Sequence, residues 1–208
     1  MPAHRARPLV DHQRGSAASG RIRNVCVFCG SARGDDPQFV EAARHTGALL
    51  AGRALGLVYG GGHIGMMGAL ADAAMAAGGH VTGVIPRPLM RPEVVHLGLS
   101  ELIVVESMQQ RKELMADRAD CFLVLAGGYG TLDETFEMVT ALQLGLQRKP
   151  VVLVNTRGYF DPLLRWVQHA VECGFVAQGQ ARLLPAADTA EAALALLEFD
   201  ALRLDRKA

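Results

Sequence analysis

Two stretches of this sequence place charged side chains next to glycine-rich or polar turns. The first, AGGYGTLDE at residues 126–134, follows an apolar run and ends in Asp133 and Glu134. The second, ESMQQRKELM at residues 106–115, carries Arg111 and Lys112. A carboxylate beside a phosphate pocket can act as a general base or stabilise a developing cation, and an arginine can orient a bound anion. The pattern favours a site for a phosphate-bearing ligand.

A second glycine-rich turn supports this interpretation. GLVYGGGHIG contains Gly60, Gly61 and Gly62 between an apolar run and a helical pattern, as AGGYG does. Unpaired N–H groups and the positive end of the helix dipole favour an anion at such a position. Neither turn has the G-x-G-x-x-G register or a Walker A sequence, so ordinary dinucleotide or ATP binding is not indicated. A simple tight turn remains the alternative for each.

The charged residues also have purely structural interpretations. Thr131 and Glu134 fit a capping box, with Thr131 as the N-cap of the following helix. Ser107 and Gln110 predict a second capping box, which places Arg111 near the start of a helix, where a cation opposes the helix dipole by a few tenths of a kcal/mol. An anionic ligand or a nearby carboxylate would compensate, and a solvated surface charge is the alternative.

Other residues are weaker candidates. Cys26 and Cys29 form a C-x-x-C inside an apolar strand-like run, which favours small buried side chains over a redox or zinc site. His63 is expected at the surface, and the seven histidines show no metal-ligand spacing, so we expect no metal. Trp166 fits the buried stripe of an amphipathic helix. A Schiff base with pyridoxal phosphate would have few candidates, because the only lysines are Lys112, Lys149 and Lys207.

Alternating strands and helices must position these residues. We expect strands at 24–29, 56–59, 80–85, 102–106, 121–126 and 150–155, and helices near 37–54, 65–77, 108–117, 131–147, 161–173 and 188–198. Asp161 should cap the fifth helix, with Pro162 at its first position. The strands are continuously apolar, as in a parallel sheet covered on both faces. The pattern predicts a doubly wound α/β domain that binds ligands at the carboxyl ends of its strands.

Composition limits the class of protein. The chain has 208 residues, is half hydrophobic and has a formal net charge of zero, which suits one domain and does not indicate a nucleic-acid partner. We expect a disordered basic tail at 1–22, the domain at 23–200 and a C-terminal tail at 201–208. The first segment lacks the apolar centre of a secretory signal, and no apolar run is long enough to span a membrane, so we expect a cytoplasmic protein.

The motifs together resemble the LOG (Lonely Guy) family, whose members are often labelled lysine decarboxylases. AGGYGTLDE resembles its P-G-G-x-G-T-x-x-E signature, and VYGGGHIGMMGALA and MQQRKELM resemble two further blocks in the same order, over about residues 24–175. The resemblance implies a Rossmann-like fold, a homodimer and a phosphoribohydrolase that splits cytokinin riboside 5′-monophosphates into free base and ribose 5-phosphate. We expect no cofactor, and the sequence leaves open whether AMP is a substrate as well.

The resemblance also implies the site. Arg111 and Glu134 match the family's catalytic pair. Ala126 stands where the family has proline, and Gln109 where histidine is common, which bears on the range of substrates rather than on the reaction. The resemblance also implies substrate-binding residues, which are Glu93, Lys112, Gly127, Gly128, Tyr129, Gly130, Thr131 and Thr140. We add Gly61 and Gly62 from the other glycine turn and Ser31 from the end of the first strand.

Two other functions fit parts of the same pattern. A non-catalytic carrier of a nucleotide or of molybdenum cofactor would use the same glycine turns, although it would not need both Arg111 and Glu134. A pyridoxal-phosphate lysine decarboxylase would need a reactive lysine. The proline-rich connection at residues 86–100 is expected to border the base pocket, but the sequence does not identify the base.

Overall fold

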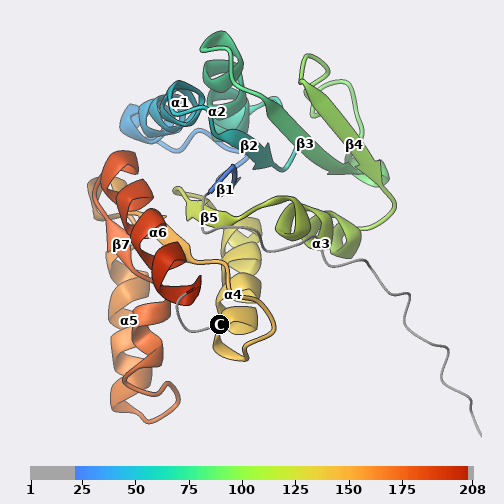
Figure 1. Ribbon diagram of the computed structural model, residues 1–208. Helices are drawn as coiled ribbons and strands as arrows, with labels where there is room; N and C mark the ends of the chain where they lie inside the picture. Colours follow the sequence, from blue (N-terminus) through green and yellow to red (C-terminus); the bar gives the residue numbers. More distant parts are fainter. Residues whose placement is uncertain (1–21, 206–208) are drawn as a thin grey trace, which may run out of the picture.

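A seven-stranded parallel sheet forms the centre of the molecule (Figure 1). The computed structural model describes residues 22–205. Every strand pairing is parallel, and the strands lie in the order β4-β3-β2-β1-β5-β6-β7. This confirms the predicted single α/β domain with a doubly wound, Rossmann-like sheet. The strands are β1 (Asn24–Phe28), β2 (Gly56–Tyr59), β3 (Val81–Pro86), β4 (Glu101–Val105), β5 (Cys121–Val124), β6 (Val151–Val154) and β7 (Ala186–Ala187).

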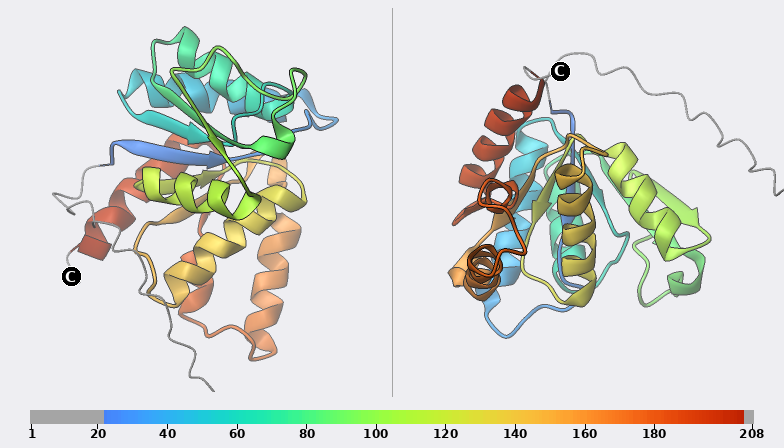
Figure 2. Two further views of the ribbon diagram at one scale, coloured as in Figure 1. Left: turned by 90° about the vertical axis from the view of Figure 1, so that its right-hand side faces the viewer. Right: turned by 90° about the horizontal axis from the view of Figure 1, so that it is seen from below.

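Six α-helices cover both faces of the sheet within the described residues (Figure 2). Helices α1, α2 and α6 pack on one face, and α3, α4 and α5 pack on the other. Because both faces are covered, the central strands are buried along their length, which explains their continuously apolar sequences. The helices are α1 (Pro37–Gly52), α2 (Gly65–Ala76), α3 (Met108–Arg118), α4 (Tyr129–Gln143), α5 (Asp161–Glu172) and α6 (Ala190–Asp205).

Some elements differ from the sequence-based expectation. The two-residue edge strand β7 was not predicted, and neither were three short 3-10 turns, η1 (Arg87–Leu89), η2 (Thr156–Gly158) and η3 (Gln180–Leu183). Asp161 is not the N-cap of α5: that position is Phe160, without a side-chain cap, and the Asp161 carboxylate accepts a hydrogen bond from Asn155 instead. Segments this short carry too little periodicity to be recognised in the sequence.

Trp166 is not buried as predicted. Its side chain is 55% exposed on α5, where Ala170 is the only fully buried residue. Helix α5 is amphipathic, as the sequence indicates, but only part of its apolar face contacts the core. Trp166 lies on the part that does not. Trp166 packs edge-on against Phe136 of α4, with ring centroids 6.1 Å apart.

The two ends of the chain are only partly described. The expected tail falls on residues 1–22, of which 1–21 lie outside the described residues, and Ile22 is buried against the core. Helix α6 continues to Asp205, beyond position 200. No helix within residues 22–205 has both the length and the apolar character needed to cross a membrane.

The sheet changes its winding direction between β1 and β5. From β1 the chain first adds β2, β3 and β4 on one side, and then crosses to add β5, β6 and β7 on the other. The turns that follow β1 and β5 therefore meet, and the Gly30 N–H donates to the Ala126 carbonyl at 2.9 Å. In open α/β sheets such a switch point is the usual place for a ligand.

The contact between α1 and α2 depends on a glycine. A Cβ atom on Gly47 would lie 2.1 Å from the Leu70 carbonyl oxygen of α2, whereas a Cβ on Gly52 at the end of the same helix would meet nothing within 4 Å. The two helices therefore pack backbone against backbone at Gly47, and this close packing fixes where α2 and its preceding glycine turn lie.

We predict opposite effects of two glycine substitutions in α1. Gly47→Ala should lower the free energy of unfolding by about 1–3 kcal/mol, because the helices must separate. Gly52→Ala should leave it unchanged or raise it by up to about 1 kcal/mol, since alanine is the better helix former. Urea unfolding of both variants measures this, and equal stabilities would contradict the close α1–α2 contact.

Candidate active site

Arg111 lies in the first turns of α3, but its side chain turns inward. Ser107 caps the helix as predicted, with its hydroxyl accepting from the Gln110 N–H at 3.1 Å, while the Gln110 side chain accepts from the Glu106 N–H. Only 7% of Arg111 is exposed. The predicted alternative, a solvated surface charge, is therefore wrong, and the cation near the helix start has partners inside the molecule.

The Arg111 guanidinium bonds to groups from several strands and helices. Nε donates to the Val84 carbonyl at 3.1 Å, and Nη2 donates to the Gly60 carbonyl at 3.2 Å. Nη1 lies 3.1 Å from Glu134 Oε1 and 3.3 Å from the Met108 sulfur. A Cβ atom on Gly60 would lie 1.8 Å from Nη2, so glycine at this position makes room for the guanidinium.

Glu134 is the carboxylate partner of Arg111. It lies on α4 and is 5% exposed. Burial raises the pKa of the Glu134 carboxyl above its usual range, and the nearby Arg111 guanidinium acts in the opposite direction without cancelling the effect of burial. The site therefore holds a carboxylate in a poorly solvated environment, where it interacts strongly with any developing positive charge.

Lys112 forms a second, more accessible charge cluster beside this pair. Its Nζ lies 3.0 Å from Asp133 Oδ2 and 2.9 Å from Glu137 Oε2, both on α4. The hydrogen bond to Glu137 raises the pKa of Lys112, so this amine stays protonated. Arg111–Glu134 and Lys112–Asp133–Glu137 together join the start of α3 to α4.

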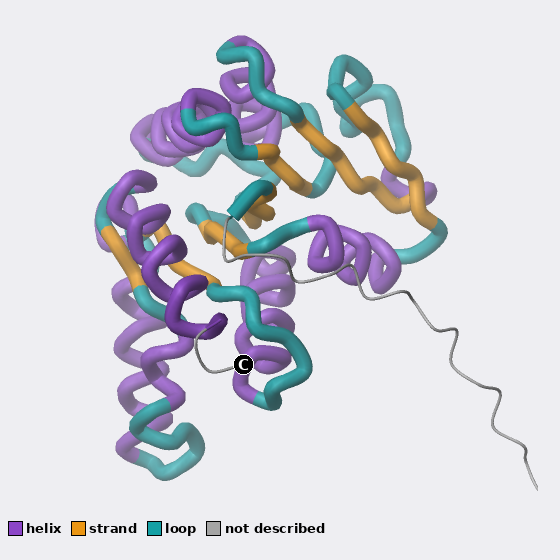
Figure 3. The backbone as a smooth tube through the Cα atoms, viewed as in Figure 1, coloured by secondary structure: helices purple, strands orange, loops and turns teal. Residues whose placement is uncertain are grey.

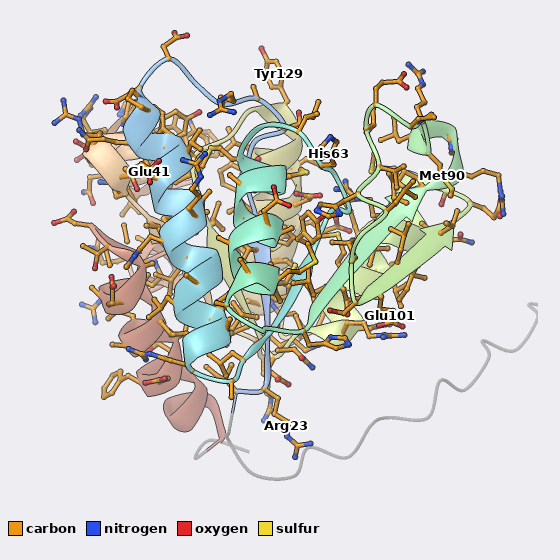
Figure 4. The ribbon with its side chains drawn as sticks, turned by 90° about the horizontal axis from the view of Figure 1, so that it is seen from above. Arg23, Glu41, His63, Met90, Glu101 and Tyr129 are labelled. Atoms are coloured by element: carbon orange, nitrogen blue, oxygen red, sulfur yellow. The ribbon has the colours of Figure 1, made fainter. Side chains whose placement is uncertain are left out.

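The N-terminus of α4 is open at the switch point. The N-cap is Gly128, and no side chain caps the first N–H groups. A Cβ atom on Gly128 or Gly130 would meet nothing within 4 Å, and Tyr129 is 97% exposed and projects outward in Figure 4. Uncapped amides at a helix start, with open space in front of them, can bind an anion such as phosphate.

Thr131 is not the N-cap, so the capping box that we predicted with Glu134 does not form. Helix α4 starts at Tyr129, and Thr131 already lies within it. Its side chain packs against Gly127, where a Cβ atom would lie 2.1 Å from Thr131 Oγ1 and 2.8 Å from the Gly30 nitrogen. Glycine at 127 is therefore required by packing, while Glu134 is free to pair with Arg111.

The first glycine turn and the long connection after β3 lie together. Val95 pairs with Gly62, the His63 N–H donates to the Val94 carbonyl at 2.8 Å, and the His96 N–H donates to the Gly61 carbonyl at 3.0 Å. The connection, one of the loops drawn in teal in Figure 3, therefore runs beside the turn that follows β2. Glu93 is exposed on this connection, two residues before Val95. His63 is exposed, as expected.

The remaining candidate residues are spread more widely. The Ser31 backbone packs against Gly65 at the start of α2, where a Cβ atom would lie 2.1 Å from the Ser31 carbonyl oxygen. Thr140 is exposed on α4, and the helical rise places it about 13 Å along the axis from Thr131. Within one chain, the structure brings Ser31 to the neighbouring turn and leaves Thr140 away from the anion site.

Cys26 and Cys29 are buried, as predicted, and burial raises the pKa of both thiols. They are therefore protonated and poor nucleophiles. No three His, Cys, Asp or Glu side chains within residues 22–205 are grouped as metal ligands.

A surface hollow of about 620 Å³ lies elsewhere, between α1 and α2. It is lined by Arg33, Arg44, His63, Ile64, Gly65, Ala69, Asp72, Ala73 and Ala76, and so includes neither Arg111 nor Glu134. We therefore place the candidate active site at Glu134, whose pKa is raised, and at the uncapped amides of α4, rather than in this hollow.

The sequence did not reveal three further contacts of the site. The Val84 carbonyl and the Met108 sulfur hold Arg111, and Tyr159 donates to the Gly127 carbonyl. A contact through a backbone carbonyl leaves no signal in the sequence. The contact of Met108 could have been found, because Met108 stands three residues before Arg111 on a predicted helix, and residues at this spacing are neighbours.

Known proteins that are similar to this chain identify its family. A family model described as "Possible lysine decarboxylase" matches residues 67–197. The chain is 42% identical over 186 residues to a probable cytokinin riboside 5′-monophosphate phosphoribohydrolase, LOGL3, of Oryza sativa subsp. japonica, covering 89% of this chain and 88% of that protein. It is 44% identical over 178 residues to the Arabidopsis thaliana enzyme LOG7, covering 86% and 82%. The chain belongs to the LOG family.

Solved structures of other proteins share this fold. The molybdenum cofactor binding protein of Rippkaea orientalis superposes with a TM-score of 0.63 at 24% identity, over 86% of this chain and 98% of that one. The molybdenum cofactor carrier protein of Chlamydomonas reinhardtii gives 0.63 at 22% identity, over 86% and 98%. At such identities the likeness establishes a shared fold and nothing about the ligand.

We predict that Glu134 titrates above the ordinary glutamate pKa of about 4.3. The folded protein binds the Glu134 proton more tightly than the unfolded chain does. The protonated Glu134 therefore adds to the free energy of unfolding at low pH, and this contribution is lost as pH rises through the folded-state pKa. Arg111→Met should raise the Glu134 pKa further, since it removes the opposing charge. Carboxyl ¹³C NMR measures both values, and a Glu134 pKa at or below the ordinary glutamate value would contradict the effect of burial.

Proposed function

We propose that this protein hydrolyses the N-glycosidic bond of cytokinin riboside 5′-monophosphates, with AMP as a further substrate, to give free base and ribose 5-phosphate. The observation that carries the proposal is the buried Arg111–Glu134 pair beside the uncapped start of α4. The pair supplies charge for the reaction, and the helix start supplies amides for the 5′-phosphate. The names of the curated relatives specify the same substrate class.

In the proposed complex the amides of Gly128, Gly130 and Thr131 bind the phosphate. This anchor fixes the ribose against the buried carboxylate, so that binding energy from the phosphate orients the sugar. Water adds to C1′ while the C1′–N bond breaks, and the bond's electron pair leaves with the base, which takes up a proton. Glu134 stabilises the oxocarbenium-like ribose and accepts the proton of the attacking water.

Arg111 acts mainly on Glu134 in this mechanism. Its guanidinium already donates to the Val84 and Gly60 carbonyls and to Glu134, which leaves few N–H groups for a substrate. The arginine thus sets the position of the carboxylate and limits the rise of its pKa. We assign Lys112, which Asp133 and Glu137 hold beside this pair, to substrate binding.

A lysine decarboxylase mechanism finds no support in the described lysines. Lys112 is paired with two carboxylates, and Lys149 donates from Nζ to the Ala116 carbonyl at 2.7 Å. A Schiff base with pyridoxal phosphate needs an amine that can lose its proton, whereas the pKa of Lys112 is raised. Lys207 lies outside the described residues.

We predict that Glu134→Gln lowers base release from AMP and from isopentenyladenosine 5′-monophosphate by at least about 100-fold, because the carboxylate charge is lost while the side-chain shape is kept. The matched control is Glu113→Gln on the exposed side of α3, which should keep wild-type turnover. Chromatography of the free base measures turnover, and circular dichroism checks the fold. Near-normal turnover by Glu134→Gln would show that Glu134 has no catalytic role.

The same assay tests the phosphate anchor. The ribosides without a 5′-phosphate should react far more slowly than the corresponding monophosphates, because they lack the group that the α4 amides bind. Equal rates for riboside and monophosphate would contradict the anchor. Free base from neither substrate, together with tight binding of AMP, would favour a nucleotide carrier.

We further propose that the protein is a homodimer through α4 and α5. Large apolar side chains are exposed on and just after these helices, with Trp166 packed on Phe136 between them. Exposed apolar side chains that gather on one surface often mark a contact with another protein. Thr140 is exposed on the same helix, and we propose that it lies at this interface. The exposed apolar residues are Leu144 (64%), Leu146 (77%), Trp166 (55%) and Phe175 (87%).

We predict that Trp166→Glu weakens this dimer by at least about 30-fold in dissociation constant, as expected when a central aromatic contact is replaced by a charge. Sedimentation velocity over a range of concentrations measures the effect. Leu97→Glu is the matched control, because Leu97 is 73% exposed but lies on the connection after β3. A monomeric wild-type protein, or a Trp166→Glu protein that stays dimeric, would contradict the proposed interface.

A further inference from the structure

The loop between β6 and α5 reaches the anion-binding turn, although no part of the proposed mechanism uses it. The Tyr159 hydroxyl donates to the Gly127 carbonyl at 2.5 Å. Gly127 immediately precedes Gly128, the N-cap of α4, and so belongs to the turn that carries the proposed phosphate amides. A contact at this place can change the geometry of those amides.

Tyr159 is held in place from several sides. Its ring packs edge-on against Phe39 of α1 and against the buried Phe160, with centroids 5.4 and 5.0 Å apart. Asn155 fixes the loop by accepting from the Phe160 N–H at 2.7 Å and donating to Asp161 at 2.8 Å.

The backbone before Tyr159 adopts an unusual conformation. Arg157 and Gly158 have φ values of +59° and +69°. A left-handed conformation is unfavourable at a non-glycine residue such as Arg157. Its guanidinium lies 3.4 Å from an Asp36 carboxylate oxygen, which partly offsets this cost. The strained segment places the Tyr159 hydroxyl above the Gly127 carbonyl.

Two residues outside the Ala126–Gly128 turn donate hydrogen bonds that fix two successive peptide planes of this turn. The Gly30 N–H holds the Ala126 carbonyl, and the Tyr159 hydroxyl holds the Gly127 carbonyl. In a trans peptide the C=O and N–H bonds point in opposite directions, and the described residues contain no cis peptide bond. The N–H of Gly128 is therefore directed away from Tyr159, and a Cβ atom at Gly128 would meet only open space.

We propose that Tyr159 is a positioning residue that preorganises the phosphate-binding turn. This inference rests on the proposed function, since it assigns Tyr159 to the same phosphate site. Residue 126 is alanine, so no proline ring restricts the backbone before Gly127, and hydrogen bonds from Gly30 and Tyr159 take over that constraint. The hydroxyl does not touch the ligand but keeps the Gly128 N–H aimed at it.

The experiment compares wild-type protein with Tyr159→Phe, which removes the hydroxyl and keeps the ring contacts with Phe39 and Phe160. Ribose 5-phosphate is the first probe, measured by calorimetry, because it carries the phosphate and is not consumed. Adenine is the second, measured as an inhibitor of base release from AMP, because it has no phosphate. Thr46→Val is the matched control: it deletes a buried hydroxyl that donates to the Ala42 carbonyl at 2.7 Å within α1, far from the turn.

The proposal predicts that Tyr159→Phe raises the dissociation constant of ribose 5-phosphate about five- to tenfold, as expected for one lost hydrogen bond, with the adenine inhibition constant unchanged. Thr46→Val should change neither. Unchanged binding of ribose 5-phosphate by Tyr159→Phe, or an equal loss for both probes, would overturn the role of Tyr159 while leaving the proposed function standing. A wild-type protein that binds no ribose 5-phosphate would overturn the phosphate site itself, and this inference with it.

Discussion

The buried ion pair between Arg111 and Glu134 is the constraint on which the rest of the site depends. Removing two charges from water is expensive unless each finds partners, and the fold provides them for Arg111 with the carbonyls of Val84 and Gly60. The pair also requires glycine at 60, because any Cβ atom would occupy the space of the guanidinium. One interaction thus connects β2, β3, α3 and α4 at the carboxyl edge of the sheet. Losing either partner would leave an uncompensated buried charge.

The topology of the sheet explains why this pair lies next to the proposed anion site. The winding reverses between β1 and β5, which brings the turn at Gly30 against the turn at Ala126–Gly127. Helix α4 starts directly after the second turn, so its free amides and Glu134, less than two helical turns further on, face the same region. In the proposed complex a phosphate bound to those amides places its ribose near the carboxylate. Glu134 is only 5% exposed, so little water surrounds its carboxyl, and this burial raises its pKa. The geometry fits cleavage of a bond one sugar ring away from a phosphate.

Much of this arrangement could be predicted from the sequence, because it rests on strong local signals. Continuous apolar runs predicted six of the seven strands. The Ser107 cap together with the misplaced cation indicated an anionic ligand or a carboxylate near Arg111, with a solvated surface charge as the alternative. Local signals failed where tertiary packing decides. Thr131 has the sequence of an N-cap, but its side chain is taken up by the contact with Gly127, and the helix starts earlier. Trp166 has the spacing of a core residue and is exposed because the α5 stripe is wider than the core beneath it. Tyr159 carries no motif, since its role depends on a contact across 32 residues of sequence.

The most direct measurement of the central claim is a crystal structure of the Glu134→Gln variant with AMP bound. The account predicts a phosphate within hydrogen-bond distance of the amides of Gly128, Gly130 and Thr131, and C1′ of the ribose next to the side chain at 134, on the side where it meets Arg111. A nucleotide bound in the hollow between α1 and α2, or a phosphate at the α4 amides with its C1′ directed away from residue 134, would contradict it.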